Sequence, residues 1–275
     1  MGTALVKCLS YVDDIQVVYE PCVSAYHYGP DADIAQKAMI AKFMDNASAN
    51  PVDSENAFYD STCTYGWVKQ QLETDYPGKK ILLAKDQAQC LNTKYDMLPS
   101  GFRYAFLIRH PYRVWRSWKP VITRILNLDI NAVSLAEVQK ATNQPDWFAM
   151  QCNLLKYVKE NLDPNVFVID ADDLQSNPSS ILSQFCQGVG IQYNASLLKW
   201  PSDRDIMKTW KMSRISLQGN YLENEGGFYE VALKSTQFLP PKPLPKRSEL
   251  PKDIQEVADK SMQFYKQMRE MCLKP

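Results

Sequence analysis

The chain has 275 residues, enough to bury one sizeable hydrophobic core, and no shift in composition divides it into independent halves. We therefore expect a single domain over residues 1–275. Apolar residues make up 45% of the chain and charged residues 23%, which excludes a disordered or fibrous protein. Because 31 basic residues balance 31 acidic ones, we do not expect a nucleic-acid-binding surface, and any anion site must be local.

The cysteines and the hydropathy pattern indicate the cellular compartment in which the protein is expected. Seven cysteines without a CxxC pair indicate reduced thiols rather than a disulfide framework or a zinc site. No stretch approaches the length of a membrane span, and the first thirty residues lack the apolar core of a signal peptide. The sequence as it stands predicts a cytoplasmic protein with no membrane span, and a preceding segment that carried a targeting signal would change this expectation.

Four short apolar runs predict buried strands, and segments with helical spacing separate them. This alternation is typical of an α/β fold with three layers, in which a mainly parallel sheet is flanked by helices. The runs cover residues 15–19, 81–84, 104–108 and 166–169. In such sheets ligands bind beyond the carboxyl ends of the strands, so the residues there are candidates for chemistry. They are Glu20, Lys85, Arg109 and Asp170.

Prolines mark the limits of the predicted helices. Residues 111–126 open on a proline that suits a first helical turn, and Pro120 should kink or divide this helix. A second helix is expected over residues 145–160. Residues 239–251 contain too many prolines for regular structure and predict an extended connector, or alternatively a PxxP ligand, before a C-terminal helix over 252–271.

Two segments have the residue types of a phosphate site. Gly2 and Thr3 precede a helical pattern, where free backbone N–H groups and a hydroxyl can hold a phosphate; a simple helix cap is the alternative. Further along, a strand ends at Arg109, a proline starts the next helix, and Ser117 lies on its second turn. We expect this guanidinium and this hydroxyl to converge on one anion, the alternative for Arg109 being a structural ion pair.

The segment with Arg109 followed eight residues later by Ser117 resembles the 3'-phosphate-binding segment of sulfotransferases that use 3'-phosphoadenosine-5'-phosphosulfate (PAPS). Gly2, Thr3 and Ala4 are similar to the end of that family's 5'-phosphosulfate loop. The resemblance implies a P-loop sulfotransferase fold with PAPS as co-substrate and no metal. The match begins inside the loop, so we expect an N-terminally shortened loop, without the family's preceding strand and the basic residue two positions before the glycine.

The resemblance also implies catalytic residues, because sulfuryl transfer needs a base near the acceptor and groups that stabilise negative charge. Glu20 lies at a separation from Gly2 similar to that of the glutamate base in Golgi-type carbohydrate and tyrosylprotein sulfotransferases; a solvated loop glutamate is the alternative. Lys85 would stabilise the negative charge that develops on the bridging oxygen of the donor during transfer. Cytosolic members have a histidine after this lysine, whereas this chain has Asp86 and Gln87, which makes Asp86 the reserve base. A polar strand end or a salt bridge is the alternative for Lys85 and Asp86.

Other residues complete the predicted site. Lys211 and Arg214 lie in a segment similar to the family's late loop over the nucleotide end of the donor, and are candidate phosphate contacts. The aromatic residues of segment 26–30 would line an acceptor pocket or, alternatively, pack in the core. The two histidines are too few for a multi-histidine metal centre and supply a serine triad poorly, and the absence of GxxxxGK[ST] argues against an ATPase or kinase.

The sequence therefore predicts a sulfotransferase that moves a sulfuryl group from PAPS to a hydroxyl or amine of a small-molecule or carbohydrate acceptor. No nucleic acid partner is expected. Two alternatives stay open: a non-catalytic member of the same fold that binds a nucleotide or a partner, and a transferase or lyase that acts on another phosphorylated ligand.

Overall fold

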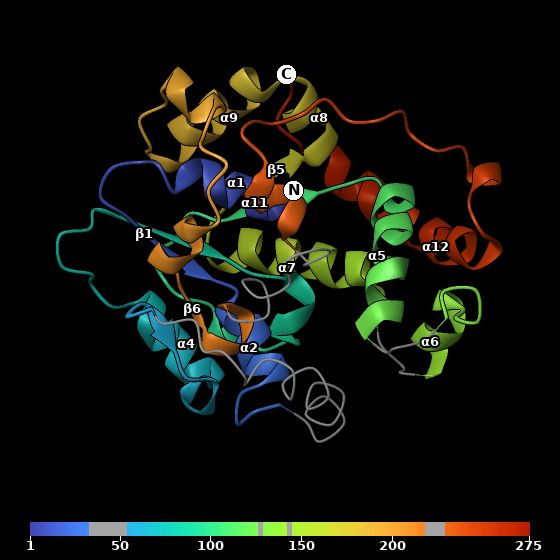
Figure 1. Cartoon of the computed structure of the whole chain (residues 1–275), viewed down its shortest axis with the longest axis horizontal. Helices are drawn as coiled ribbons and strands as arrows, with labels where there is room; N and C mark the ends of the chain where they lie inside the picture. Colours follow the sequence, from blue (N-terminus) through green and yellow to red (C-terminus); the bar gives the residue numbers. More distant parts are fainter. Residues whose placement is uncertain (33–53, 126–128, 142–144, 218–228) are drawn as a thin grey trace. The chain divides into compact units, whose positions relative to one another are not determined.

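The structure is a computed structural model that describes residues 1–32, 54–125, 129–141, 145–217 and 229–275 (Figure 1). The chain divides into two compact units, and each is described by itself. The first comprises Met1–Gly101 and Asn194–Phe238, and the second comprises Phe102–Tyr193 and Leu239–Pro275. The expectation of a single domain stays a prediction.

A four-stranded parallel sheet forms the centre of the first unit. Its strand order is β2 (Ala57–Phe58), β6 (Lys211–Ser213), β1 (Ile15–Tyr19), β3 (Ile81–Lys85). All five residues of β1 are buried, as expected of a strand with a partner on each side. The strands predicted over 15–19 and 81–84 are therefore confirmed, and the carboxyl ends of all four strands lie at one edge.

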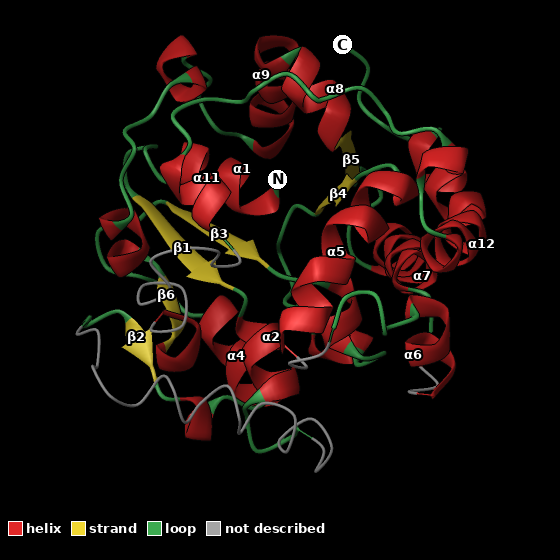
Figure 2. Cartoon of the chain, turned by 45° about the vertical axis from the view of Figure 1, so that its right-hand side comes forward, coloured by secondary structure: helices red, strands yellow, loops and turns green. Residues whose placement is uncertain are grey.

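Helices cover both faces of this sheet. Figure 2 shows α1 and α11 on one side of β1 and β3, with α2 and α4 on the other, so the α/β layering is confirmed. The bounds are α1 Gly2–Leu9, α2 Pro21–His27, α4 Tyr65–Leu72 and α11 Glu230–Lys234. Short 3-10 turns occupy Asp60–Thr62, Ala88–Leu91, Tyr95–Met97, Ala195–Leu198 and Asp205–Thr209.

Aromatic and aliphatic side chains from distant segments build the core of the first unit. Tyr19 on β1 stacks on Trp210, which directly precedes β6, with ring centroids 4.8 Å apart. On the α1 side, the buried Lys7 donates hydrogen bonds from Nζ to the carbonyl oxygens of Leu233 and Ser235. These bonds satisfy carbonyls at the end of α11, which has no further helical turn to bond them. The core residues are Val6, Val17, Tyr19, Ile206, Met207, Trp210, Met212, Leu217 and Leu233.

The second unit has two parallel strands, which confirm the runs predicted over 104–108 and 166–169. The elements are β4 Ala105–Ile108, α5 Pro111–Ile125, α6 Leu135–Ala141, α7 Trp147–Asn161, β5 Phe167–Asp170, α8 Ala171–Ser176, α9 Pro178–Val189, a 3-10 turn Arg247–Glu249 and α12 Lys252–Arg269. Helix α12 packs against α5, α6 and α7. Asp170 ends β5, and its Oδ1 accepts the N–H of Asp172, 2.8 Å away, which caps α8.

The helices of the second unit match the sequence with one difference. Helix α5 continues through Pro120 to Ile125, so the proline does not divide it, and the alternative of a kink stays a prediction. Tertiary contacts outweigh the lost backbone hydrogen bond: Lys119, buried beside the proline, pairs with Asp253 of α12 at 2.9 Å. Residues 239–251 contain no regular element except the 3-10 turn, and their role as a connector stays a prediction. Among the described helices, none has both the length and the apolar character needed to cross a membrane.

Candidate functional site

A row of polar residues follows the carboxyl edge of the four-stranded sheet. In strand order, Asp60 lies two residues beyond β2, Ser213 ends β6, Glu20 follows β1 and Lys85 ends β3. Because the four strands are parallel, these residues lie at the same edge. This is the edge at which open α/β sheets bind their ligands.

The Glu20 carboxylate is buried, with 2% of its side-chain surface exposed, so the alternative of a solvated loop glutamate is wrong. Three donors surround it. Lys85 forms an ion pair with Oε1, and Gln87 donates to the same oxygen from Nε2 at 3.0 Å. The Tyr229 hydroxyl donates to Oε2. Sequence reasoning placed Glu20 and Lys85 here, but gave no role to Gln87 or Tyr229.

The backbone at Glu20 explains how its side chain reaches Lys85. Glu20 has a left-handed conformation, φ 51°, which residues other than glycine rarely adopt. Its N–H donates to the carbonyl oxygen of Lys85 at 2.7 Å, and Pro21 starts α2 at the next position. The turn from β1 into α2 is therefore tied to the end of β3. Residues held in such conformations by their surroundings are common at functional sites.

The electrostatic surroundings of Lys85 favour its charged form. Burial is the largest single influence and lowers the pKa of this ammonium, but Glu20, Tyr19 and Asp86 together raise the pKa overall. The Nζ atom lies 5.0 Å from the ring centroid of Tyr19 and 5.9 Å from that of Tyr229, so two aromatic faces add attraction. The salt bridge considered from sequence is therefore present, and it places a fixed positive charge at the sheet edge.

A hydrogen bond connects this group to the start of α1. The hydroxyls of Thr3 and Tyr19 lie 2.7 Å apart, and Thr3 is buried. Gly2, Thr3 and Ala4 form the first turn of α1, and no side chain caps that turn. We call the connected residues Thr3, Tyr19, Glu20, Lys85, Gln87 and Tyr229 the Glu20 network. Backbone N–H groups of an uncapped first turn suit an anion.

Asp86 has a different arrangement. Its carboxylate accepts the backbone N–H groups of Cys22 at 2.6 Å and Val23 at 3.1 Å, so it caps the first turn of α2. Desolvation raises the pKa of Asp86, and these hydrogen bonds oppose the rise. Because the residue is exposed, solvent screens much of this pKa shift. The contacts show that Asp86 has a structural role as the cap of α2, and its role as reserve base stays a prediction.

Lys211 and Arg214 lie on and directly after β6. The Nζ atom of Lys211 donates to Gln71 at 2.7 Å, and burial lowers the pKa of this lysine. The Arg214 guanidinium lies 4.2 Å from the ring centroid of Tyr59, and its Nε is buried without a hydrogen-bond partner among the described residues. Their predicted contacts with the nucleotide end of the donor stay predictions.

In the second unit, Arg109 forms a structural ion pair, the alternative to anion binding that the sequence left open. Its Nε lies 3.1 Å from Asp172, and its guanidinium also donates to Gln175 at 3.2 Å. Arg113 pairs with the other oxygen of Asp172 at 2.7 Å. Two guanidinium groups thus converge on one carboxylate, as they would on a phosphate. Ser117 is exposed on α5, and its predicted part in an anion site stays a prediction.

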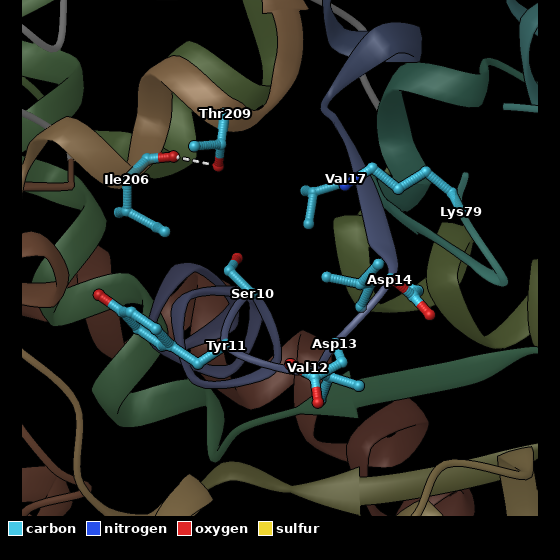
Figure 3. A pocket seen from close by; sticks show the side chains of 10 residues that line it. Ser10, Tyr11, Val12, Asp13, Asp14, Val17, Lys79, Ile206 and Thr209 are labelled. Atoms are coloured by element: carbon cyan, nitrogen blue, oxygen red, sulfur yellow. Dashed lines mark hydrogen bonds between the residues drawn. The ribbon is translucent and has the colours of Figure 1, made fainter. Parts of the chain in front are cut away.

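The first unit also has a hollow of about 330 Å³ at the opposite end of β1. Figure 3 shows it beside Ser10 and Thr209, with Asp13 and Asp14 at the start of the strand. Its lining residues are Ser10, Tyr11, Val12, Asp13, Asp14, Ile15, Val17, Lys79, Ile206 and Thr209. It lies at the amino end of β1, so it is separate from the Glu20 network at the carboxyl end.

Comparisons with known proteins give two findings. The family model described as "Sulfotransferase domain" matches residues 1–272. A solved structure, the sulfotransferase domain from the curacin biosynthetic pathway, is 18% identical and aligns over 82% of this chain and 72% of its own, with a TM-score of 0.39. No curated protein matches the sequence.

Proposed function

Because the chain belongs to the sulfotransferase domain family, we propose that it moves a sulfuryl group from PAPS to a hydroxyl or amine of a small-molecule or carbohydrate acceptor. The observation that supports this most directly is the Glu20 network. A buried carboxylate, a fixed ammonium and an uncapped helix start are connected at the carboxyl edge of a parallel sheet. These are the groups that sulfuryl transfer requires.

The start of α1 is suited to the sulfated end of the donor. Gly2 has no side chain to obstruct an anion, and the first-turn N–H groups have no side-chain cap. The Thr3 hydroxyl, held by Tyr19, adds a polar contact. When bound, PAPS supplies the sulfuryl group and leaves as 3',5'-adenosine bisphosphate.

Glu20 and Lys85 divide the remaining work. Glu20 accepts the proton that the acceptor hydroxyl or amine loses, while Tyr229 and Gln87 hold the carboxylate in place. Lys85 stabilises negative charge near the site of transfer, and its ion pair with Glu20 keeps the ammonium beside the base. Asp86 keeps the end of β3 and the start of α2 in register.

Arg109 and Ser117 hold the 3'-phosphate of the donor in this proposal, and Lys211 and Arg214 contact its nucleotide end. The pairing of Asp172 with Arg109 and Arg113 supports an anion at this position, since both guanidinium groups already surround a carboxylate. A phosphate would then compete with Asp172 for Arg109.

The variant Glu20→Gln tests the proposal, with the exposed Glu73→Gln as the matched control for loss of a carboxylate. We expect Glu20→Gln to lower turnover about a hundredfold or more, the usual effect of losing a general base, while 3',5'-adenosine bisphosphate still binds. Calorimetry measures that binding, and release of the bisphosphate in an acceptor screen measures turnover. Normal turnover by Glu20→Gln would show that Glu20 is not the base. Donor binding without turnover by the wild-type chain would favour the non-catalytic alternative.

A further inference from the structure

Asp60 is a buried carboxylate whose surroundings satisfy it incompletely. Its relative exposure is 8%. Oδ2 accepts the N–H of Ile215 at 3.5 Å, the outer limit of a hydrogen bond, and the Ser213 hydroxyl also bonds to the carboxylate. Oδ1 is buried and has no hydrogen-bond partner, and Asp60 makes no ion pair within the described part of the chain. A buried carboxylate oxygen without a donor is costly, so this position favours a ligand that supplies one.

The position of Asp60 relates it to the Glu20 network. Asp60 begins the turn after β2, and β6 separates β2 from β1 in the sheet. Neighbouring strands lie about 4.8 Å apart, so β2 and β1 are about 10 Å apart along the sheet edge. Asp60 and Glu20 therefore stand at the same edge with a separation that one small molecule can span.

Tyr28, at the end of α2, lies near both carboxylates. Burial raises the pKa of Tyr28, and the charges of Asp60 and Glu20 raise it further. The neighbouring Gly29 fixes this segment, since a Cβ built on Gly29 would lie 2.0 Å from the carbonyl oxygen of Cys63. The N–H of Cys63 in turn donates to the carbonyl oxygen of Asp60 at 3.1 Å, so this close approach brings the end of α2 to the turn that Asp60 begins. The ring of Tyr28 is therefore available to contact a cation in this region.

We propose that Asp60, with Ser213 and Tyr28, forms a subsite for a primary ammonium group of the acceptor, about 10 Å along the sheet edge from the group that Glu20 deprotonates. The inference deepens the proposed function and rests on it. An ammonium offers three donors and a positive charge, so it satisfies the open oxygen of Asp60 and neutralises the carboxylate. A neutral hydroxyl would supply a donor but leave the buried charge uncompensated. Tyr59, the preceding residue, is 60% exposed, so this segment reaches the surface.

The test uses two sets of probes that differ in one end group, an ammonium in one set and a neutral hydroxyl in the other. Straight-chain α,ω-amino alcohols of four to eight carbons are compared with the diols of the same lengths, at pH 8 and in the presence of 3',5'-adenosine bisphosphate. Ligand-observed nuclear magnetic resonance measures their dissociation constants for the wild-type chain, Asp60→Asn and Asp60→Ser. The exposed Asp75→Asn is the control, because it removes one carboxylate elsewhere on the first unit.

We expect the wild-type chain and Asp75→Asn to bind the best amino alcohol at least tenfold more tightly than its diol, and the Asp60 variants to lose this preference. Equal binding of the two sets by the wild-type chain would overturn the proposal, as would a preference that persists in both Asp60 variants. Glu20→Gln separates the two proposals. If this variant keeps its turnover, the base assignment fails, while the preference for amino alcohols still decides the Asp60 subsite independently.

Discussion

The unsatisfied carboxylate of Asp60 predicts how stability depends on pH. Burial raises the pKa of Asp60 from 3.8 to about 6, against hydrogen bonds from Ser213 and from the N–H of Ile215. Between pH 3.8 and about pH 6, Asp60 is therefore mostly protonated in the folded state and mostly ionised in the unfolded state. Stability falls as pH rises through this window, and the whole penalty is present above pH 6. A shift of about 2 units corresponds to a penalty of about 3 kcal/mol.

The variant Asp60→Asn removes this titration. The amide of this variant would bury an N–H₂ group that has no acceptor, which costs about 1–3 kcal/mol of stability at every pH. The stability difference between the variant and the wild-type chain at a single pH therefore does not test the titration of Asp60. The difference between two pH values cancels that cost. Between pH 5 and pH 8 the variant should gain about 1.4 kcal/mol of unfolding free energy relative to the wild-type chain.

Urea unfolding at pH 5, 6, 7 and 8 measures this gain, with Asp75→Asn as the control for loss of a surface carboxylate. If the wild-type chain and Asp60→Asn depend on pH in the same way, Asp60 has a satisfied environment and the reasoning is refuted. A gain that arises between pH 5 and pH 7 and does not grow further at pH 8 would support it.

Other residues give three further predictions. Tyr229→Phe removes one donor to Glu20 and keeps the ring beside Tyr19, so steady-state kinetics should show kcat reduced about tenfold; an unchanged kcat would exclude a positioning role. Gly29→Ala forces a Cβ against a backbone oxygen and should cost about 1–3 kcal/mol of stability, which thermal unfolding measures and an unchanged Tm would contradict. Arg109→Ala should weaken calorimetric binding of 3',5'-adenosine bisphosphate tenfold or more, whereas unchanged affinity would leave Arg109 with only its structural contacts to Asp172 and Gln175.

The sequence by itself determined the elements that short-range patterns encode. Continuous apolar runs predicted β1, β3, β4 and β5, and Pro111 predicted the start of α5, because burial on both faces and a fixed φ leave local marks. Parallel strands also share a carboxyl edge, so the sequence could place Glu20 and Lys85 near each other. The match of the family model to residues 1–272 confirms the family that the Arg109 segment indicated.

Only the tertiary structure decided which other side chains reach these positions. Strands β2 and β6 have two and three residues, too few for a hydrophobic pattern, and they pair because the sheet supplies their partners. Tyr229 bonds to Glu20 across 209 positions of sequence, a contact that no local pattern can encode. The same holds for the orphaned oxygen of Asp60. A hydrogen bond forms only where the folded chain brings a donor within about 3 Å of an acceptor. For these residues the long connections between strands, and not their neighbours in sequence, determine which groups come that close.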